Sequence, residues 1–211
     1  MSQSIDWYFD YLSPFSYVQF ERLQREPRLQ LRYYPVLFAG LLNHWGQLGP
    51  AEIPPKRRFV YQQAVWLGAR HGCPVRLPAA HPFNPLGALR LTCALGATPE
   101  VVAEIFRFVW RDGKRLDTDW RLLVERLGVS DADELANSDA AKAQLKGNGE
   151  QAIARGVFGV PTAVLPDGRL FWGLDATEML LDNIAGDPLF ASAEYARASD
   201  LPSGVHRRGR G

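Results

Sequence analysis

The run Ser13-Pro14-Phe15-Ser16 constrains this chain more than any other segment, because it separates two different patterns. Before it, the short apolar run at residues 5–9 is typical of a strand. After it, Tyr17, Phe20 and Leu23 recur at three-residue spacing, which predicts an amphipathic helix. Serine followed by proline is a common pairing of N-cap and first helical residue. The run therefore places the N-terminus of a helix directly after a strand.

The chemistry of this junction follows from the helix N-terminus. The first backbone N–H groups of a helix have no partner within it, and the helix dipole favours negative charge there. A serine hydroxyl at this point can donate a hydrogen bond to an anion, but it cannot form a disulfide. The natural guest is a thiolate brought in from outside, such as the sulfur of glutathione. The alternative is that Ser13 and Pro14 only cap the helix.

The composition is that of a soluble globular protein. Hydrophobic residues make up 46% and charged residues 22% of the 211 residues, and the formal net charge is +1. We therefore expect neither nucleic acid nor a membrane as a partner, since no apolar run approaches the ~20 residues of a membrane span. Asp6 and Asp10 interrupt the N-terminal apolar stretch, which argues against a signal peptide. The basic cluster at 206–210 is typical of a disordered end.

The two cysteines, Cys73 and Cys93, do not form a Cys-x-x-Cys pair, and no further cysteine is present to complete a zinc site. We expect both to be small buried hydrophobic residues, and no bound metal. So few cysteines suit a reducing compartment, which predicts a cytoplasmic protein.

Two β-containing segments enclose a helical one. The first has strands at 5–9 and 29–34 around a helix at 14–25, a β-α-β unit that implies parallel strands. Residues 36–147 are predicted to be mostly helical, with helices at 56–70, 82–95, 101–110, 119–127, 131–135 and 140–145. The last segment is predicted to hold a helix at 150–155, a hairpin of strands at 160–165 and 169–172, and a final helix at 176–184.

This order, β-α-β, a helical block and then α-β-β-α, is that of a thioredoxin-like α/β fold split by a large all-helical insertion. We assign residues 1–36 and 149–190 to the thioredoxin-like domain, 37–148 to the helical insertion domain and 191–211 to a tail. In thioredoxin-like folds the junction after the first strand usually carries Cys-x-x-Cys. Here Ser13 and Ser16 occupy the two cysteine positions.

A second motif, Gly159-Val160-Pro161-Thr162, begins the third predicted strand. Proline is tolerated there because the first residue of a strand needs no ladder donor. In thioredoxin-like folds a cis proline at this point faces the junction motif. The backbone N–H and C=O of Val160 can then pair with a bound peptide, as in strand addition, and glutathione is a peptide. The alternative is an ordinary strand start.

The two motifs together resemble the 2-hydroxychromene-2-carboxylate isomerases, which group with kappa-class glutathione transferases in the DsbA-like branch of thioredoxin folds. The resemblance starts at residues 8–17 and extends to about residue 185. Its most specific parts are Ser-Pro-Phe-Ser and the block Phe-Gly-Val-Pro-Thr at 158–162, and looser matches occur at 49–50, 55–57, 82–86 and 171–175.

The resemblance implies a glutathione site on matching residues. Ser13 would hold the glutathione thiolate and is the expected catalytic residue, because a hydrogen bond and a helix dipole both lower a thiol pKa. Asp175 would meet the γ-glutamyl amine, or cap the last helix. Lys56, with Arg57 beside it, would supply a cation, or be a solvated helix start. The expected glutathione-binding set is Ser13, Phe15, Lys56, Val160, Pro161 and Asp175.

The resemblance also implies a substrate site and a reaction. Asn43, His44 and Trp45 are expected on a loop facing the site, although a lone histidine is more often a surface or capping residue. Phe83 and Asn84 lie between two prolines, where Phe83 is equally suited to core packing. The implied reaction interconverts 2-hydroxychromene-2-carboxylate and trans-o-hydroxybenzylidenepyruvate, or a related aromatic catabolite, in a homodimeric enzyme.

Two other functions stay open. A kappa-like glutathione transferase acting on another electrophile would use nearly the same residues. The other is a thiol-redox or non-catalytic thioredoxin-fold protein: Ser13 and Ser16 argue against redox work because no thiol is present at the turn, whereas a module that binds glutathione without turnover stays an alternative.

Overall fold

The computed structural model describes residues 3–202 and residue 204. Its strands form one mixed sheet in the order β2-β1-β3-β4. They are β1 (Gln3–Phe9), β2 (Leu29–Pro35), β3 (Thr162–Val164) and β4 (Leu170–Trp172). β1 and β2 are parallel, whereas β3 is antiparallel to both β1 and β4. The predicted β-α-β unit and the predicted hairpin are both confirmed.

Most of the predicted helices are present, and the chain forms two further α-helices that were not predicted. α1 (Pro14–Leu23) connects β1 to β2. The middle of the chain forms α2 (Phe38–Trp45), the short 3-10 helix η1 (Pro50–Glu52), α3 (Pro54–Arg70), α4 (Leu86–Ala94), α5 (Pro99–Phe106), the π-helical turn η2 (Arg107–Arg111), α6 (Trp120–Leu127), α7 (Ala132–Asn137) and α8 (Asp139–Ala154). After the sheet come α9 (Ala176–Ala185), η3 (Pro188–Ala191) and α10 (Ala193–Ser199).

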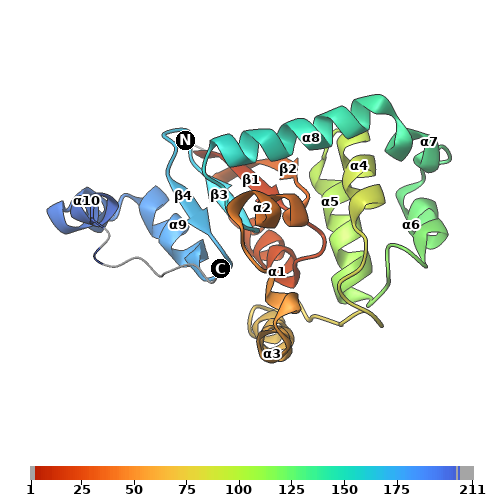
Figure 1. Ribbon diagram of the computed structural model, residues 1–211, viewed down its shortest axis with the longest axis horizontal. Coiled ribbons are helices and arrows are strands. Elements are labelled where there is room, and N and C mark those ends of the chain that lie inside the picture. The colour runs from red at the N-terminus through yellow and green to blue at the C-terminus, as the bar shows by residue number, and fades with distance from the viewer. Residues whose placement is uncertain (1–2, 203, 205–211) are drawn as a thin grey trace, which may run out of the picture.

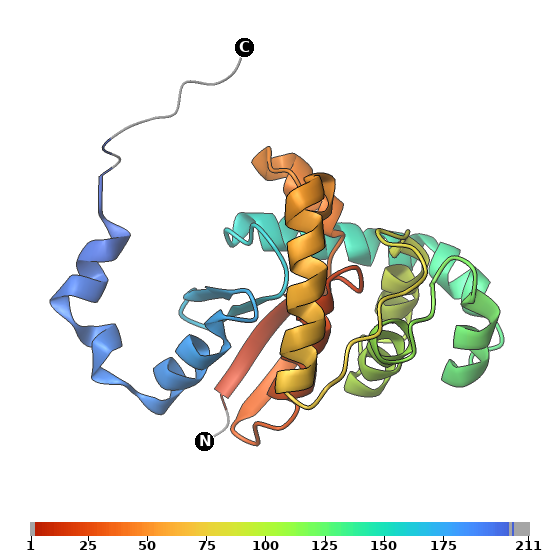
Figure 2. The ribbon, with the colours of Figure 1, turned by 90° about the horizontal axis from the view of Figure 1, so that it is seen from below.

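The sheet lies between two unequal groups of helices. Figure 1 shows α4, α5, α6 and α7 on one side of the sheet and α9 and α10 on the other, with α8 running from the larger group back to the sheet. Figure 2 shows the same arrangement from below, with α3 crossing in front of the β1–α1 region. α3 packs against α1, so the helical middle of the chain covers the helix that begins at the Ser-Pro-Phe-Ser motif.

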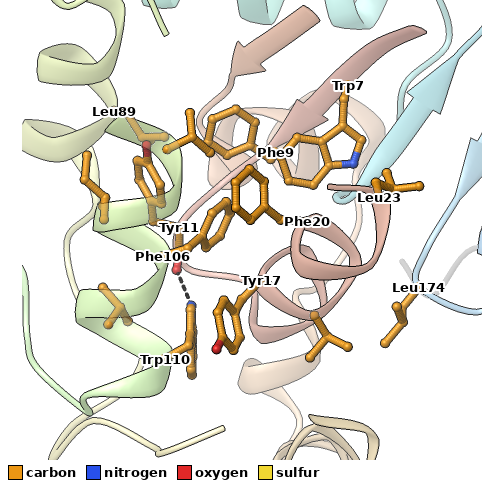
Figure 3. Packing of buried hydrophobic residues seen from close by; sticks show 14 of the residues in the cluster. Trp7, Phe9, Tyr11, Tyr17, Phe20, Leu23, Leu89, Phe106, Trp110 and Leu174 are labelled. Atoms are coloured by element: carbon orange, nitrogen blue, oxygen red, sulfur yellow. Dashed lines mark hydrogen bonds between the residues drawn. The ribbon is translucent and has the colours of Figure 1, made fainter. Parts of the chain in front are cut away.

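One aromatic core joins the sheet to the helical insertion. The ring of Phe106, from α5, lies 4.8 Å from that of Tyr11 and 5.5 Å from that of Phe9, measured between ring centroids. It also packs against Phe20 of α1, at 5.6 Å. Figure 3 shows these rings side by side. Aromatic groups of this size contribute most of the apolar area that a core removes from water. The insertion therefore shares its core with the sheet and α1.

The predicted boundary at residues 148 and 149 is wrong in one respect, because it falls inside a single helix. α8 continues through Gly147 and Gly149, where the sequence suggested a break. Ser138 caps this helix by accepting a hydrogen bond from the N–H of Ala141. Asn148 is buried and donates to the carbonyl of Pro35, at 3.0 Å. Tertiary contacts thus keep a glycine-containing segment helical, against its intrinsic preference.

One further expectation changes. The tail assigned to 191–211 contains α10, whose N-cap Ser192 accepts from the N–H of Tyr195. The ring of Tyr195 packs on that of Phe190 at 5.0 Å, and Phe190 in turn packs on Phe171 of β4.

The basic cluster at 206–210 lies outside the described residues. Among the described residues, no helix combines the length and apolar character needed to span a bilayer.

Candidate active site

The turn between β1 and α1 is held partly from within. The backbone N–H of Ser13 donates to the carbonyl of Asp10 at 3.1 Å, and the N–H of Leu12 donates to the Asp10 carboxylate at 2.9 Å. The second carboxylate oxygen accepts from the N–H of Phe38, the first residue of α2, at 2.9 Å. Asp10 is fully buried, and this burial raises its pKa to about 6 although both N–H donors favour the charged form.

Two side chains from the helical insertion hold the same turn from outside. The indole of Trp110 donates to the carbonyl of Tyr11 at 2.8 Å, the contact drawn as a dashed line in Figure 3. His81 Nε2 lies 2.8 Å from the carbonyl oxygen of Leu12. A carbonyl only accepts, so Nε2 carries the proton. The backbone preceding Ser13 is thereby fixed before any ligand binds.

Ser13 is the N-cap of α1, and its Oγ accepts from the N–H of Ser16 at 3.1 Å. Its hydroxyl hydrogen donates to no residue that the structure describes. Pro14 has no N–H, and the N–H of Phe15 also has no acceptor within the described part of the chain. Ser13 Oγ–H and Phe15 N–H are therefore two donors at the positive end of a ten-residue helix, where an anion is stabilised.

The Val160–Pro161 peptide bond is cis, as expected from the sequence. β1 pairs with β3 so that Tyr8 lies opposite Thr162. Continuing this antiparallel register places Val160 and Pro161 beside the end of β1 that leads to Ser13. Neither the N–H nor the C=O of Val160 is hydrogen-bonded to a described residue, so both are available for pairing with an extended ligand.

Asp175 follows β4 and precedes α9. Its side chain is exposed and caps no N–H of α9, so the expected capping role is not observed. It makes no ion pair within residues 3–202. A Cβ atom placed on Gly173 would lie 2.5 Å from Asp175 Oδ1, and Gly173 has φ +90°. The carboxylate is thus held over the backbone of a turn that only glycine forms easily.

The residues expected to face the substrate are not on a loop. Asn43, His44 and Trp45 form the last turn of α2, which ends at Gly46 with φ +62°. The indole of Trp45 donates to the carbonyl of Val157 at 3.0 Å, so the ring lies against the segment leading to Pro161. His44 packs edge-on against Trp45 with 4.9 Å between ring centroids. All three side chains are exposed.

Phe83 and Asn84 have different environments. Phe83 is buried and packs against His81 and Trp110, so its ring belongs to the core behind the turn. Asn84 is exposed, and its Oδ1 accepts from the N–H of Leu86 at the start of α4. Phe83 therefore packs against His81, the residue that contacts the turn. Asn84 instead accepts a hydrogen bond at the start of α4.

One cation of α3, Arg57, lies near Tyr61, which contacts the turn through His81. The hydroxyl of Tyr61 is 2.7 Å from Nδ1 of His81, and Arg57 precedes Tyr61 by one helical turn. The charge of Arg57 acts to lower the pKa of Tyr61, whereas burial, the larger effect, raises it. Lys56 is exposed and forms no ion pair with a described residue. Of the two expected cations, the structure connects Arg57 more directly to Ser13.

The cysteines match their expected role as small, largely buried residues. Cys73 is buried and Cys93 is partly buried. Burial raises the pKa of Cys73 and raises that of Cys93 to about 11, so neither thiol ionises readily.

Three side chains around the turn carry no signal in the sequence. His81 and Trp110 reach residues 69 and 99 positions away. Gln19 of α1 is buried and contacts Gly173, 154 positions away. His81 and Trp110 lie far from Ser13 in the sequence, and although Gln19 is on the helix that Ser13 caps, no spacing rule predicts its contact with Gly173.

Comparison with known proteins supports this architecture. Residues 4–185 match the family of the DSBA-like thioredoxin domain. The chain is 31% identical over 195 residues to a 2-hydroxychromene-2-carboxylate isomerase of Pseudomonas sp. (strain C18), covering 88% of this chain and 92% of that protein. It is 29% identical to glutathione S-transferase kappa 2 of Caenorhabditis elegans, covering 78% and 82%.

A solved structure gives the same result. The structure of a 2-hydroxychromene-2-carboxylate isomerase superposes with a TM-score of 0.76 at 26% identity, covering 95% of this chain and all of that one. Sequence, domain family and fold therefore agree: this chain belongs to the DsbA-like thioredoxin domain family and, within it, to the family of the 2-hydroxychromene-2-carboxylate isomerases.

Proposed function

We propose that this protein is a glutathione-dependent isomerase that interconverts 2-hydroxychromene-2-carboxylate and trans-o-hydroxybenzylidenepyruvate, or a closely related aromatic catabolite. The observation that carries the proposal is the pair of donors at the N-terminus of α1, Ser13 Oγ–H and Phe15 N–H, which meet no acceptor among the described residues. Donors of this kind stabilise an anion, and burial raises the pKa of both thiols of the chain itself, which disfavours their ionisation.

The residues fit glutathione along its length. Ser13 and Phe15 would hold the sulfur, and Ser13 would lower the thiol pKa by one to two units, since a hydrogen bond to a charged group is worth roughly 1.5–3 kcal/mol. The backbone of Val160 suits the cysteinyl unit, because its N–H and C=O are not hydrogen-bonded to any described residue and can pair with the backbone of a bound peptide. The unpaired carboxylate of Asp175 suits the γ-glutamyl ammonium group.

When bound, glutathione supplies a thiolate that adds reversibly to a conjugated carbon–carbon double bond, so that the bond can rotate with no net redox change. Arg57 and Lys56, at the start of α3, would neutralise the carboxylate of the substrate. The exposed ring of Trp45, next to Val157, offers an aromatic surface for the substrate ring. Ser13 needs to form no covalent bond.

The proposal is tested by following the interconversion with and without glutathione. We expect no turnover without it, saturable activation by glutathione, and none by S-methylglutathione, which binds the same groups but has no thiol. Equal turnover without glutathione would contradict the proposal.

The second candidate, a kappa-like glutathione transferase acting on another electrophile, is favoured by the similarity to the kappa transferase of Caenorhabditis elegans. The two candidates differ in stoichiometry, because an isomerase returns glutathione after every turnover and a transferase consumes it. Titration of the remaining thiol after many turnovers separates them.

A further inference from the structure

A buried amide links the helix of Ser13 to the turn of Asp175. Gln19 lies on α1 and is only 1% exposed. Its Nε2 donates to the carbonyl of Gly173 at 2.9 Å and to the hydroxyl oxygen of Thr177 at 3.0 Å. Its Oε1 accepts from the indole N–H of Trp7 at 2.7 Å. The orientation of the amide is thus set by one acceptor contact and two donor contacts.

The same turn is tied to the cis-proline segment. The N–H of Gly173 donates to the carbonyl of Pro161 at 2.8 Å, while the carbonyl of Gly173 accepts from Gln19. Thr177 is fully buried and donates to the carbonyl of Leu174 at 2.6 Å. The turn at 173–177 is therefore held on one side by the cis-proline segment that precedes β3 and on the other by Gln19.

Only a neutral amide satisfies this position. The carbonyl of Gly173 needs a donor and the indole of Trp7 needs an acceptor, and the glutamine side chain supplies both in one planar group. Glutamate would bring a buried charge and no donor, whereas methionine would leave both partners unsatisfied. Since Ser13 caps the same helix, Gln19 sets where the Asp175 turn lies relative to Ser13.

We infer that Gln19 is a positioning residue that fixes the Asp175 turn relative to the Ser13 helix end, and thereby makes the site selective for thiols that carry a γ-glutamyl group. This inference rests on the proposed function. A ligand without that group, such as cysteinylglycine, keeps the thiol and the dipeptide backbone but loses the partner of Asp175. The natural chain is therefore expected to prefer glutathione, and the preference depends on the position of the turn.

The test compares the two thiols as co-substrates of the isomerisation. For the natural chain we expect kcat/KM to be about tenfold or more higher with glutathione than with cysteinylglycine, because one charge-assisted contact is lost. Gln19→Met should raise KM for glutathione about tenfold, leave KM for cysteinylglycine nearly unchanged, and alter kcat little. Because Ser13 is intact, the ultraviolet thiolate signal at saturating glutathione should persist.

The matched control is Asn148→Leu. Asn148 is another buried amide that donates to a backbone carbonyl, that of Pro35, but it lies on α8 and contacts neither Gly173 nor Thr177. It should lower thermal stability and keep the preference for glutathione. If Gln19→Met does not fold, Thr177→Val removes one of the two acceptors and should reduce the preference in the same direction.

The outcomes separate the two hypotheses. If the natural chain prefers glutathione and Gln19→Met retains that preference, the role of Gln19 is wrong and the proposed function stands. If the natural chain isomerises the substrate with no thiol present, the proposed function fails, and the role of Gln19 fails with it.

Discussion

His81 Nε2 donates to the main-chain carbonyl of Leu12 at 2.8 Å, one residue before Ser13. The other ring nitrogen, Nδ1, faces the hydroxyl of Tyr61 at 2.7 Å. Burial lowers the pKa of His81, which favours the neutral ring with its proton on Nε2. In this form Tyr61 donates to Nδ1. A chain of two hydrogen bonds thus connects α3 to the backbone that positions Ser13.

We expect His81→Leu to lower kcat/KM about tenfold, because the carbonyl of Leu12 then has no donor and a lost hydrogen bond of this kind costs ~1–3 kcal/mol. Tyr61→Phe is the control: it removes the hydroxyl but leaves the contact between His81 and Leu12. Its effect should stay below about threefold. Steady-state kinetics measures kcat/KM for both variants. Equal losses of kcat/KM in the two would show that His81 does not act through Leu12.

Ser13→Ala should both destabilise the protein and weaken thiolate formation. Loss of the N-cap costs ~1 kcal/mol, and loss of the hydroxyl donor should raise the pKa of bound glutathione by about one to two units. Ser138→Ala removes an equivalent cap, since Ser138 Oγ also accepts from the N–H three residues on, at 3.2 Å. Calorimetric unfolding should show similar losses in both variants. The thiolate absorbance should fall only in Ser13→Ala, and a loss in both would contradict the assignment.

Asp10 predicts a pH dependence of stability. The pKa of this carboxyl group is raised from 3.8 to about 6 in the folded state. The stability that the protonated carboxyl group contributes is therefore fully present below about pH 4 and is lost as the pH rises through 6. The unfolding free energy should therefore fall by about 3 kcal/mol over this range through Asp10 alone. In Asp10→Asn the fall in unfolding free energy between pH 4 and 7 should vanish. The variant should instead be less stable by the same amount at every pH, because the amide cannot accept both backbone N–H bonds. Denaturant unfolding from pH 4 to 7 measures it, and parallel profiles would contradict the prediction.

Two helical glycines should respond in opposite directions to the same substitution. A Cβ atom at Gly68 in α3 would lie 2.7 Å from the carbonyl oxygen of Cys73 and 2.7 Å from Val75 Cγ2, whereas one at Gly147 in α8 meets nothing within 4 Å. Gly147→Ala should stabilise by ~0.5–1 kcal/mol through helix propensity. Gly68→Ala should destabilise by ~1–3 kcal/mol, because the clash outweighs that gain. Chemical denaturation measures the unfolding free energy of the two variants. Stabilisation of both would show that the backbone at 73–75 shifts to accommodate the added methyl group at little cost.

The sequence predicted the local parts of this protein well. The strand, turn and helix around Ser13, the parallel β1–β2 pair and the β3–β4 hairpin all depend on residues close together in the chain, whereas the cis Val160–Pro161 bond was expected from the likeness to thioredoxin-like folds. Such features follow from capping, the fixed φ of proline and the alternation of side chains, which act over a few residues.

Errors arose where packing overrode local preference. Gly147 and Gly149 suggested a break, yet α8 continues because Asn148 is anchored to Pro35. Trp45 was expected on a loop, yet it ends α2, where its indole bonds the carbonyl of Val157. In both cases a contact across more than a hundred residues determines the local structure.

By itself the sequence determined the order of strands and helices and the two motifs of the site, because these depend on residue types at short spacing, and the resemblance of those motifs to known proteins indicated the family. The tertiary structure alone decided which side chains hold those motifs in place. His81 and Trp110 reach the turn before Ser13 from 69 and 99 residues away, and Gln19 on α1 joins that helix to Gly173, 154 residues further on. Hydrogen bonds of this kind form only after the chain has packed, since a buried polar group takes whichever partner the fold brings within reach.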